Sequence, residues 1–123
     1  MISTVAAAVA VMILAALGVL QTLVAAGRPY GRLVWGGQHA TLPRKLRIGS
    51  AVSLVLYLAI ALVLIARTSN PSSSFVRTTT WAICGYFVVG IAMNAISRSR
   101  SERLVMTPTC VVLAACSLAL ATS

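Results

Sequence analysis

Hydrophobic residues in this chain of 123 residues gather in four long runs, and short polar segments separate the runs. Each run approaches the roughly 20 mostly apolar residues that an α-helix needs to cross the hydrocarbon core of a bilayer. The pattern predicts four membrane-spanning helices, at about residues 2–26, 48–66, 79–96 and 104–121. No other region could form a core of its own, so residues 1–123 are expected to make a single membrane domain. The predicted fold class is an all-α integral membrane four-helix bundle built from two helical hairpins.

The first run could also be a secretory signal, because it is N-terminal and ends in small residues at Ala25 and Ala26. It has no basic segment in front of its apolar stretch, however, and that stretch exceeds the about 7 to 15 residues that are usual in signals. We therefore expect a helix that is retained.

Charged residues are rare and unevenly placed. They make up 9% of the chain, whereas 59% is hydrophobic, and a soluble domain carries about 25% charged residues. Eight of the ten basic residues lie in the segments after the first and third runs: Arg28, Arg32, Arg44, Lys45, Arg47, Arg98, Arg100 and Arg103. Short positively charged loops tend to stay in the cytoplasm. The remaining loop, over 67–78, holds only Arg67 and Arg77, so this loop and both termini are predicted to face outside (N-out, C-out).

The formal net charge of +9 bears on the choice of partner. On a soluble surface it would suggest nucleic acid, but here the charges flank segments of hydrocarbon length. Anionic membrane lipids are therefore the expected partner, and nucleic acid is not.

The first polar segment reads GRPYGRLVWGGQHATLPRKLRIGS, which is long for a connection between helices. Tyr30 and Trp35 are aromatics that favour membrane interfaces, and Gly36–Gly37 allows a tight backbone turn. We expect local structure at the membrane surface, bounded by Pro29 and Pro43. The alternative is a loop that only anchors the chain at the interface. Candidate residues for binding lipid or a partner are Arg28, Tyr30, Arg32, Trp35, His39, Arg44, Lys45, Arg47, Arg98 and Arg103.

The second basic segment contains Glu102, which is the only acidic residue of the chain. Ser99 and Glu102 have the spacing of a capping box, in which the serine caps a helix and the glutamate reaches back to it. Alternatively, if the third helix continues, Asn94, Arg98 and Glu102 lie one turn apart on one face. Glu102 would then act as a clamp between Arg98 and an arginine of the first loop.

Two motifs carry a resemblance to known proteins. The first is G-x-P-Y-G-x-x-x-W-G-G-x-H-x-x-L-P-x-x-L-R-x-x-S, over Gly27–Ser50, and the second is N-x-x-S-R-S-x-x-E-R-x-x-M-T-P, over Asn94–Pro108. They resemble those of a family of small four-helix bacterial membrane proteins, and the resemblance covers nearly the whole chain. It implies the same fold and topology, in a multi-pass protein of the bacterial cytoplasmic (inner) membrane. The family has no assigned activity, so no functional residue carries over.

Several polar side chains fall within the cytoplasmic halves of the predicted helices. Such side chains tend to face the interior of a bundle. If they converge, they form a small polar pocket roofed by the first loop, with Arg98 and His39 near its opening. The alternative is ordinary hydrogen bonding between helices. The pocket candidates are Gln21, Ser53, Asn94, Glu102 and Thr107.

The reactive residue types do not form a recognisable catalytic or metal-binding pattern. Cys84, Cys110 and Cys116 lie inside predicted helices without C-x-x-C spacing, so we expect buried thiols. His39 is the only histidine and has no ligand partners at suitable spacing. No exposed nucleophile accompanies His39 and Glu102. The sequence therefore predicts no enzyme activity, no cofactor and no metal site.

Two classes of function remain. One is an accessory or oligomeric membrane subunit, in which Ala6 and Ala10, or Ala115 and Ala119, allow close approach of helices from another chain or a second copy. Such a protein would be a homo-oligomer or part of a larger membrane complex. The other is a minimal dimeric transporter or channel for a small solute or anion. The lack of a carboxylate at bilayer depth weakens this second class.

Overall fold

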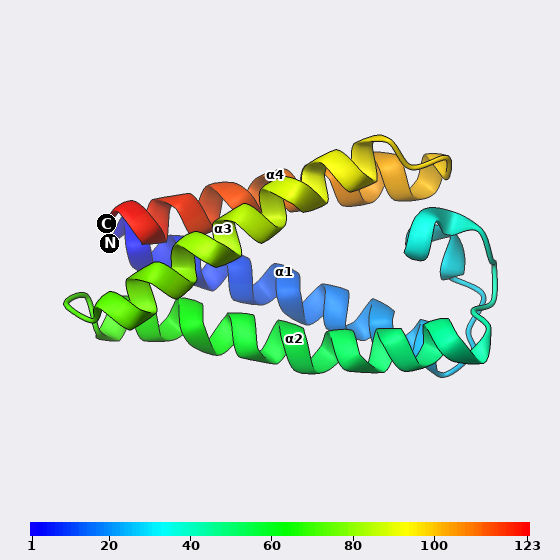
Figure 1. Ribbon diagram of the computed structural model, residues 1–123, viewed down its shortest axis with the longest axis horizontal. Coiled ribbons are helices and arrows are strands. Elements are labelled where there is room, and N and C mark those ends of the chain that lie inside the picture. The colour runs from blue at the N-terminus through cyan, green and yellow to red at the C-terminus, as the bar shows by residue number, and fades with distance from the viewer.

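The computed structural model describes residues 1–123 and contains four long helices (Figure 1). They are α1 (Ile2–Ala25), α2 (Arg44–Ser69), α3 (Ser74–Ala95) and α4 (Arg100–Thr122). All four are long and apolar enough to cross a membrane. The predicted all-α fold is confirmed, and by helix length and hydropathy the chain is a multi-pass membrane protein.

Helices α2, α3 and α4 each begin about one turn earlier than the apolar runs predict. Pro43 precedes α2, while Ser73 and Ser99 cap α3 and α4 by accepting hydrogen bonds from the backbone N–H of Val76 and Glu102. A capped first turn can be polar or charged and still helical. The hydrophobic pattern therefore located the apolar part of each helix rather than its beginning.

The helices form two hairpins, since α1 packs on α2 and α3 packs on α4, and a further contact joins α1 to α4. Both termini and the turn between α2 and α3 lie at one end of the bundle, called here the terminal end (Figure 1). The connections from α1 to α2 and from α3 to α4 lie at the other end. This second end carries the eight clustered basic residues and is called the basic end.

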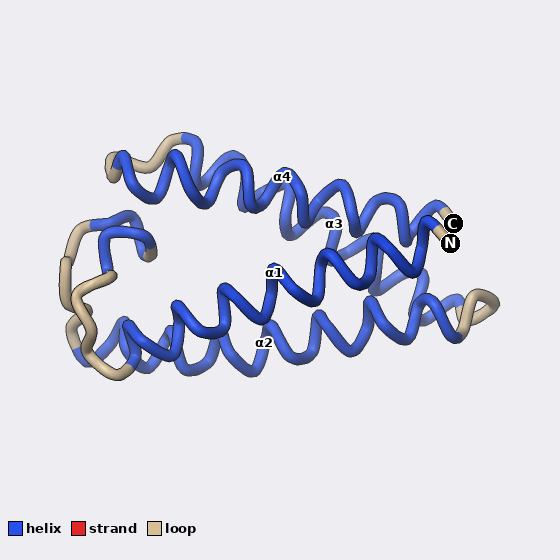
Figure 2. Tube along the Cα trace, turned by 180° about the vertical axis from the view of Figure 1, so that it is seen from behind, coloured by secondary structure: helices blue, strands red, loops and turns tan.

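The main hydrophobic core fills the terminal half of the bundle. All four helices contribute to it, with Leu14, Leu64, Phe87 and Leu113 among its buried residues. Towards the basic end, α3 and α4 diverge from α1 and α2, as the views from both sides show (Figures 1 and 2). The first loop folds into this opening.

Local structure in the first loop agrees with the expectation from its length. Two short 3₁₀ turns, η1 (Gly31–Leu33) and η2 (Trp35–Gly37), lie in the loop. Val34 and Leu42 are buried together with Val24 of α1 in a second, small core. These contacts attach the loop to the bundle.

Two expectations about the terminal half are wrong. Arg67 belongs to α2 and not to the loop, because α2 continues to Ser69. Its guanidinium turns back into the bundle and is only 2% exposed. Ala6 and Ala10 pack inside the core of the chain itself, and Ala10 has no exposed surface. They are therefore not available to a second chain, whereas Ala115 remains exposed.

Arg67 joins three segments at the terminal end. Its Nε donates to the Leu120 carbonyl at 3.0 Å, Nη1 donates to the Pro71 carbonyl at 2.9 Å, and Nη2 donates to the Ser123 carbonyl at 2.7 Å. Carbonyls at the end of a helix have no partner within the helix. The buried guanidinium therefore satisfies the end of α4 and holds it beside α2.

Candidate functional site

Trp35 occupies an unusual backbone conformation in the first loop. Its φ is +53°, and Gly36 and Gly37 follow with φ of +76° and +67°. Glycine adopts such angles freely, but a bulky residue does so only where its surroundings impose them. Two contacts hold Trp35: its Nε1 donates to Ser50 Oγ at 2.9 Å, and its ring lies against Gly49, where an added Cβ would be 2.8 Å from Cζ2. The loop thus lays the indole across α2.

The first loop is also joined to the beginning of α4. Ser99 Oγ donates to the Arg32 carbonyl at 2.5 Å, and Arg32 Nη1 donates to the Gly37 carbonyl at 2.7 Å. Gly37 lies so close to Ser99 that an added Cβ would overlap the serine Cβ. The loop therefore bridges the two hairpins at the basic end.

Glu102 is held by serines and not by arginines. Its Oε2 accepts a hydrogen bond from Ser97 Oγ at 2.6 Å, and Ser97 Oγ accepts one from the Ser99 N–H at 3.2 Å. Together with the bond from the Glu102 N–H to Ser99 Oγ, these contacts resemble a capping box. The Glu102 carboxylate reaches the Ser99 N–H through the Ser97 hydroxyl instead of accepting from it directly. The predicted cap is present in this modified form.

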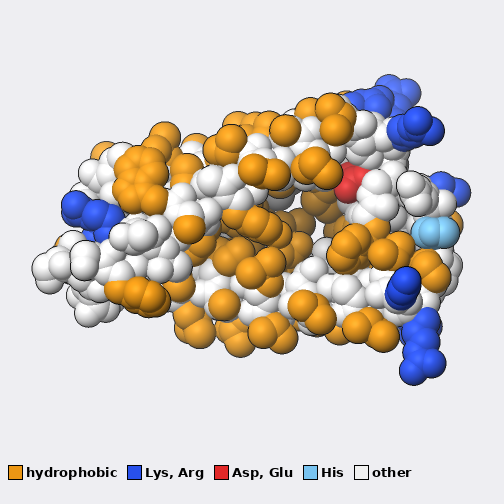
Figure 3. All heavy atoms as spheres, viewed as in Figure 1, with side chains coloured by type: hydrophobic (Ala, Val, Ile, Leu, Met, Phe, Trp, Pro, Cys, Tyr) orange, Lys and Arg blue, Asp and Glu red, His pale blue; other side chains and the backbone are white.

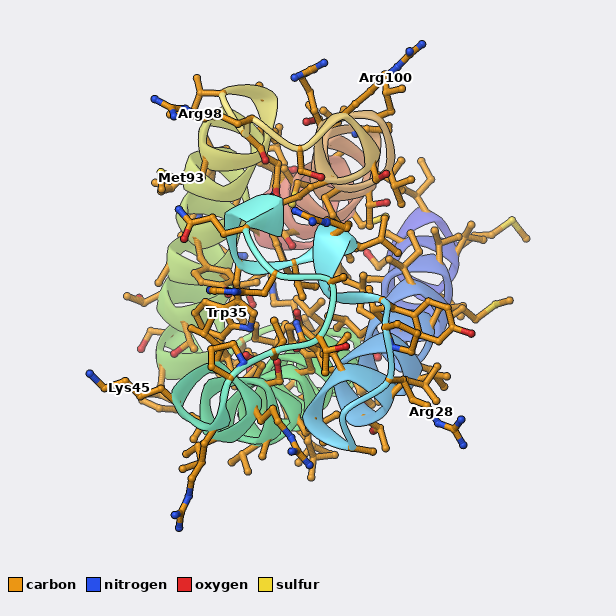
Figure 4. All side chains as sticks on the ribbon, turned by 90° about the vertical axis from the view of Figure 1, so that its right-hand side faces the viewer. Arg28, Trp35, Lys45, Met93, Arg98 and Arg100 are labelled. Carbon is orange, nitrogen blue, oxygen red and sulfur yellow. The ribbon has the colours of Figure 1, made fainter.

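The predicted clamp by Glu102 is wrong. Helix α3 ends at Ala95, so Asn94, Arg98 and Glu102 do not share one helical face. Arg98 is exposed, and Figure 4 shows it pointing away from the bundle. Arg103 Nη1 donates to the Ser97 carbonyl instead, at 3.0 Å.

A cavity of about 440 Å³ lies between the hairpins in the basic half, and it is called here the inner cavity. Leu33, Val34 and Trp35 of the first loop line it together with residues from all four helices. Figure 3 shows the hollow on one face of the molecule, with the single acidic side chain at its edge. That side chain is Glu102, which is only 7% exposed.

The polar side chains in the wall of the inner cavity leave acceptor groups free. Gln21 is 7% exposed, and its Nε2 donates to the Tyr57 hydroxyl at 3.3 Å, while its Oε1 is buried with no hydrogen-bond partner. Asn94 Nδ2 donates to the Gly90 carbonyl at 2.8 Å and to Cys110 Sγ at 3.3 Å. Because both amides use their nitrogens within the chain, their oxygens remain for another partner.

The structure brings together three of the five predicted pocket residues. Gln21, Asn94 and Glu102 line the inner cavity under the first loop. Ser53 instead donates to the Gly49 carbonyl within α2, and the Thr107 hydroxyl is buried without a partner outside the cavity. Ordinary hydrogen bonding within and between helices therefore accounts for only part of this polar set.

Sequence reasoning missed several polar residues of the wall. Tyr57, Tyr86, Thr109 and Cys110 also line the cavity. Aromatic and sulfur side chains inside apolar runs look like core residues, so hydropathy gives no signal for them. Helical spacing from Glu102 could have indicated Cys110, which lies two turns further along the same face of α4.

The outer surface of the basic end is rich in free positive charge. Figure 4 shows Arg28, Lys45, Arg98 and Arg100 pointing away from the bundle, whereas Trp35 lies within its outline. Other predicted binding residues are exposed on the loops or at the start of a helix, namely Tyr30, Arg32, His39, Arg44, Arg47 and Arg103. Of the candidates for binding, Trp35 alone lines the inner cavity; Arg98 and His39 do not.

No group of His, Cys, Asp and Glu side chains is arranged to hold a metal ion. Comparison with known proteins gives no match to a family model, to a curated protein or to a solved structure. The resemblance of the two loop motifs to a bacterial family therefore stays a prediction.

Proposed function

We propose that this multi-pass membrane protein is an accessory or oligomeric subunit, and not an enzyme, whose basic end binds anionic lipid headgroups. The observation that carries the proposal is that all eight basic side chains of the basic end are exposed, whereas the terminal end has one exposed basic side chain, Arg77. At the terminal end, the Arg67 guanidinium is buried and its three nitrogens all donate to carbonyls. At the basic end, five side chains are exposed and make no hydrogen bond within the chain: Arg28, Arg44, Lys45, Arg98 and Arg100.

The remaining arginines at the basic end also keep donors free. Arg32, Arg47 and Arg103 each donate one hydrogen bond to a backbone carbonyl. A guanidinium has five N–H groups, and its planar shape suits the oxygens of a phosphate. Each basic residue near an anionic membrane surface contributes about 1 kcal/mol to binding. The cytoplasmic leaflet of a bacterial inner membrane is the expected surface, since positively charged loops face inside.

The experiment compares lipids bound to the purified protein in a mild detergent. Native mass spectrometry during titration with phosphatidylglycerol or phosphatidylcholine is expected to show a clear preference for the anionic lipid. Combining Arg28→Ala, Arg44→Ala and Lys45→Ala removes about 3 kcal/mol, so the preference should fall by roughly two orders of magnitude.

Arg77→Ala at the terminal end is the matched control, because Arg77 is exposed but lies outside the basic end. It should leave the lipid preference unchanged. Equal retention of both lipids by the unaltered protein would contradict the proposal. If an acidic protein co-purified with the unaltered protein but not with the triple variant, the partner of the basic end would be that protein and not a lipid.

Transport of a small solute is a second candidate function, and a specific observation favours it. The sequence places no carboxylate at bilayer depth, which disfavours transport, but Glu102 is buried in the wall of the inner cavity. Solute flux in proteoliposomes that Glu102→Gln abolishes and Arg77→Ala preserves would support a transporter. Four helices make a thin wall around such a path, so we propose a dimer for this case, with the exposed Ala115 at the contact between copies.

A further inference from the structure

The inner cavity offers acceptors and one carboxylate, whereas the outer surface of the basic end offers positive charge. We infer that the inner cavity binds a cationic amphipathic amine, with its ammonium group towards Glu102 and its apolar body between the hairpins. The inference is independent of lipid binding at the basic end, because none of the exposed basic side chains lines the cavity.

Hydrogen-bonding capacity in the wall points to a ligand that donates. The Gln21 Oε1 atom is buried without a partner, and an unpaired buried acceptor is unfavourable. Asn94 uses its nitrogen for two bonds within the chain, so its oxygen is the group left for a ligand. Glu102 accepts a hydrogen bond from Ser97 at Oε2, and its other carboxylate oxygen is free to accept from a ligand. Three helices thus each contribute an acceptor to the same cavity.

The sign of the ligand charge follows from the same residues. Glu102 is the only acid of the chain, and its hydrogen-bond partners are neutral serines. An anion in the cavity would face this carboxylate and two amide oxygens, and it would find no basic side chain in the wall. A cation would be attracted to the carboxylate. The inner cavity therefore favours cations, whereas the basic outer surface attracts anions.

Aromatic faces add to the attraction for a cation. Trp35, Tyr57, Tyr86 and Phe87 all line the cavity, and cations bind favourably over aromatic rings. The hydrogen bond to Ser50 and the contact with Gly49 keep the Trp35 indole in this wall. Quaternary and primary ammonium groups both gain from the rings, but only a primary ammonium can also donate to the free oxygens.

The apolar body of the ligand has ample room. The remaining wall is mostly hydrophobic, and a second groove of about 510 Å³ runs along α1 and α4 beside the inner cavity. Leu17, Leu33 and Met106 line both spaces. A compact hydrocarbon cage fits the inner cavity alone, and a longer chain could extend into the groove.

The test uses Trp35 as its reporter. The chain has two tryptophans, so Trp81→Phe leaves Trp35 as the only tryptophan, and excitation at the red edge of indole absorption avoids emission from the three tyrosines. In nanodiscs of phosphatidylcholine, this protein is titrated with 1-adamantylammonium, adamantane-1-carboxylate and 1-adamantanol, which share one apolar body. We expect a saturable change in Trp35 emission with the ammonium probe, at an affinity at least tenfold higher than for the carboxylate.

Glu102→Gln isolates the charge, since an amide oxygen can still accept from Ser97. It should weaken binding of the ammonium probe about tenfold, in line with the loss of a charge-assisted hydrogen bond. Gln21→Leu should weaken it severalfold without changing the charge, and it tests the site even if Glu102→Gln fails to fold. Arg77→Ala, at the terminal end and outside the cavity, is the matched control and should bind like the parent.

Three results would overturn the inference. They are equal or tighter binding of the carboxylate probe, no saturable signal with the ammonium probe, and unchanged binding in both Glu102→Gln and Gln21→Leu. The thermal midpoint of each variant in the same nanodiscs shows whether weakened binding reflects the site or a loss of fold.

Discussion

Residues 35–37 have three consecutive positive φ angles, and the two glycines among them differ in their surroundings. Gly36 has open space around it, because an added Cβ would meet nothing within 4 Å. At Gly37 an added Cβ would overlap Ser99 Cβ and would lie 2.9 Å from the Arg32 carbonyl oxygen. Gly37 is therefore required both for its backbone angle and for the contact between the first loop and α4.

This difference predicts a matched pair of variants. Gly36→Ala should cost about 1 kcal/mol, which is the strain of a positive φ for alanine. Gly37→Ala carries the same strain and also pushes the loop away from Ser99, so the loss should exceed about 2 kcal/mol. Unfolding of both proteins in a mild detergent, followed by circular dichroism, measures the two losses. Equal losses would mean that the contact with Ser99 does not matter.

A single hydrogen bond also holds the first loop over the inner cavity. Ser50 is fully buried in α2, and its hydroxyl accepts from the Trp35 indole. Ser50→Ala leaves this N–H without its partner, which costs about 1–3 kcal/mol. The loss should fall on the loop alone, because Ser50 makes no other side-chain bond between elements. We expect faster amide hydrogen exchange over residues 31–37, measured by mass spectrometry, with helices α1 to α4 unchanged.

Ser53→Ala is the control for this measurement. Ser53 lies one turn further along α2, and its hydroxyl donates only to the Gly49 carbonyl of its own helix. Its removal should not alter exchange in the loop. Protection of residues 31–37 that survives Ser50→Ala would show that packing of Val34 and Leu42, and not the indole bond, holds the roof in place.

At the scale of helices, the terminal end depends on one buried side chain. Arg67→Met keeps much of the volume but removes the bonds that end α4 beside α2. Hydrogen bonds that involve charged groups contribute about 1.5–3 kcal/mol each, and some of the freed carbonyls will find water. We expect a net loss of about 2–4 kcal/mol in the free energy of unfolding in detergent.

Arg77 provides the comparison on the same end of the bundle. It is exposed and makes a single long hydrogen bond of 3.4 Å to the Ser123 carbonyl. Arg77→Ala should therefore change stability by no more than about 0.5 kcal/mol. If the two substitutions had the same effect, the buried position of Arg67 would have no consequence for stability.

Hydrophobic patterning predicted the number and type of the helices because each must bury about 20 apolar residues in a bilayer. It could not locate the first turns of α2, α3 and α4, since capping by a side chain such as Ser99 is independent of hydropathy. It also placed Arg67 in a loop, because a charged residue usually ends a spanning segment. A guanidinium that bonds to three carbonyls is a tertiary contact, which no local pattern encodes.

At the scale of the whole molecule, the inner cavity with its carboxylate lies close to the positively charged outer surface of the basic end. Polar side chains in apolar helices tend to face inwards, so the sequence indicated a pocket under the first loop if such side chains converged. Of the five candidates, Gln21, Asn94 and Glu102 line the inner cavity, and Ser53 and Thr107 do not. The sequence could not predict that the hairpins diverge enough to leave a cavity there. The main core lies in the terminal half, and the first loop with its own small core lies between the hairpins at the basic end.

Orientation in the membrane decides which leaflet the basic end meets. In a protein whose three cysteines are replaced by alanine, Ser72→Cys places a thiol at the terminal end and Lys45→Cys places one at the basic end. Both positions are exposed and neither caps a helix or bonds to another side chain. Eight basic residues at one end against two at the other predict that the basic end stays in the cytoplasm.

A membrane-impermeant maleimide should therefore label Ser72→Cys in intact cells and label Lys45→Cys only after the membrane is opened. The reverse result would place the positive charges outside, away from the anionic cytoplasmic leaflet, and lipid binding at the basic end would lose its physical basis. The inner cavity would keep its acceptors in either orientation. An amine would then approach it from the opposite side of the membrane, so the direction of any transport would change while the selectivity for a cation would not.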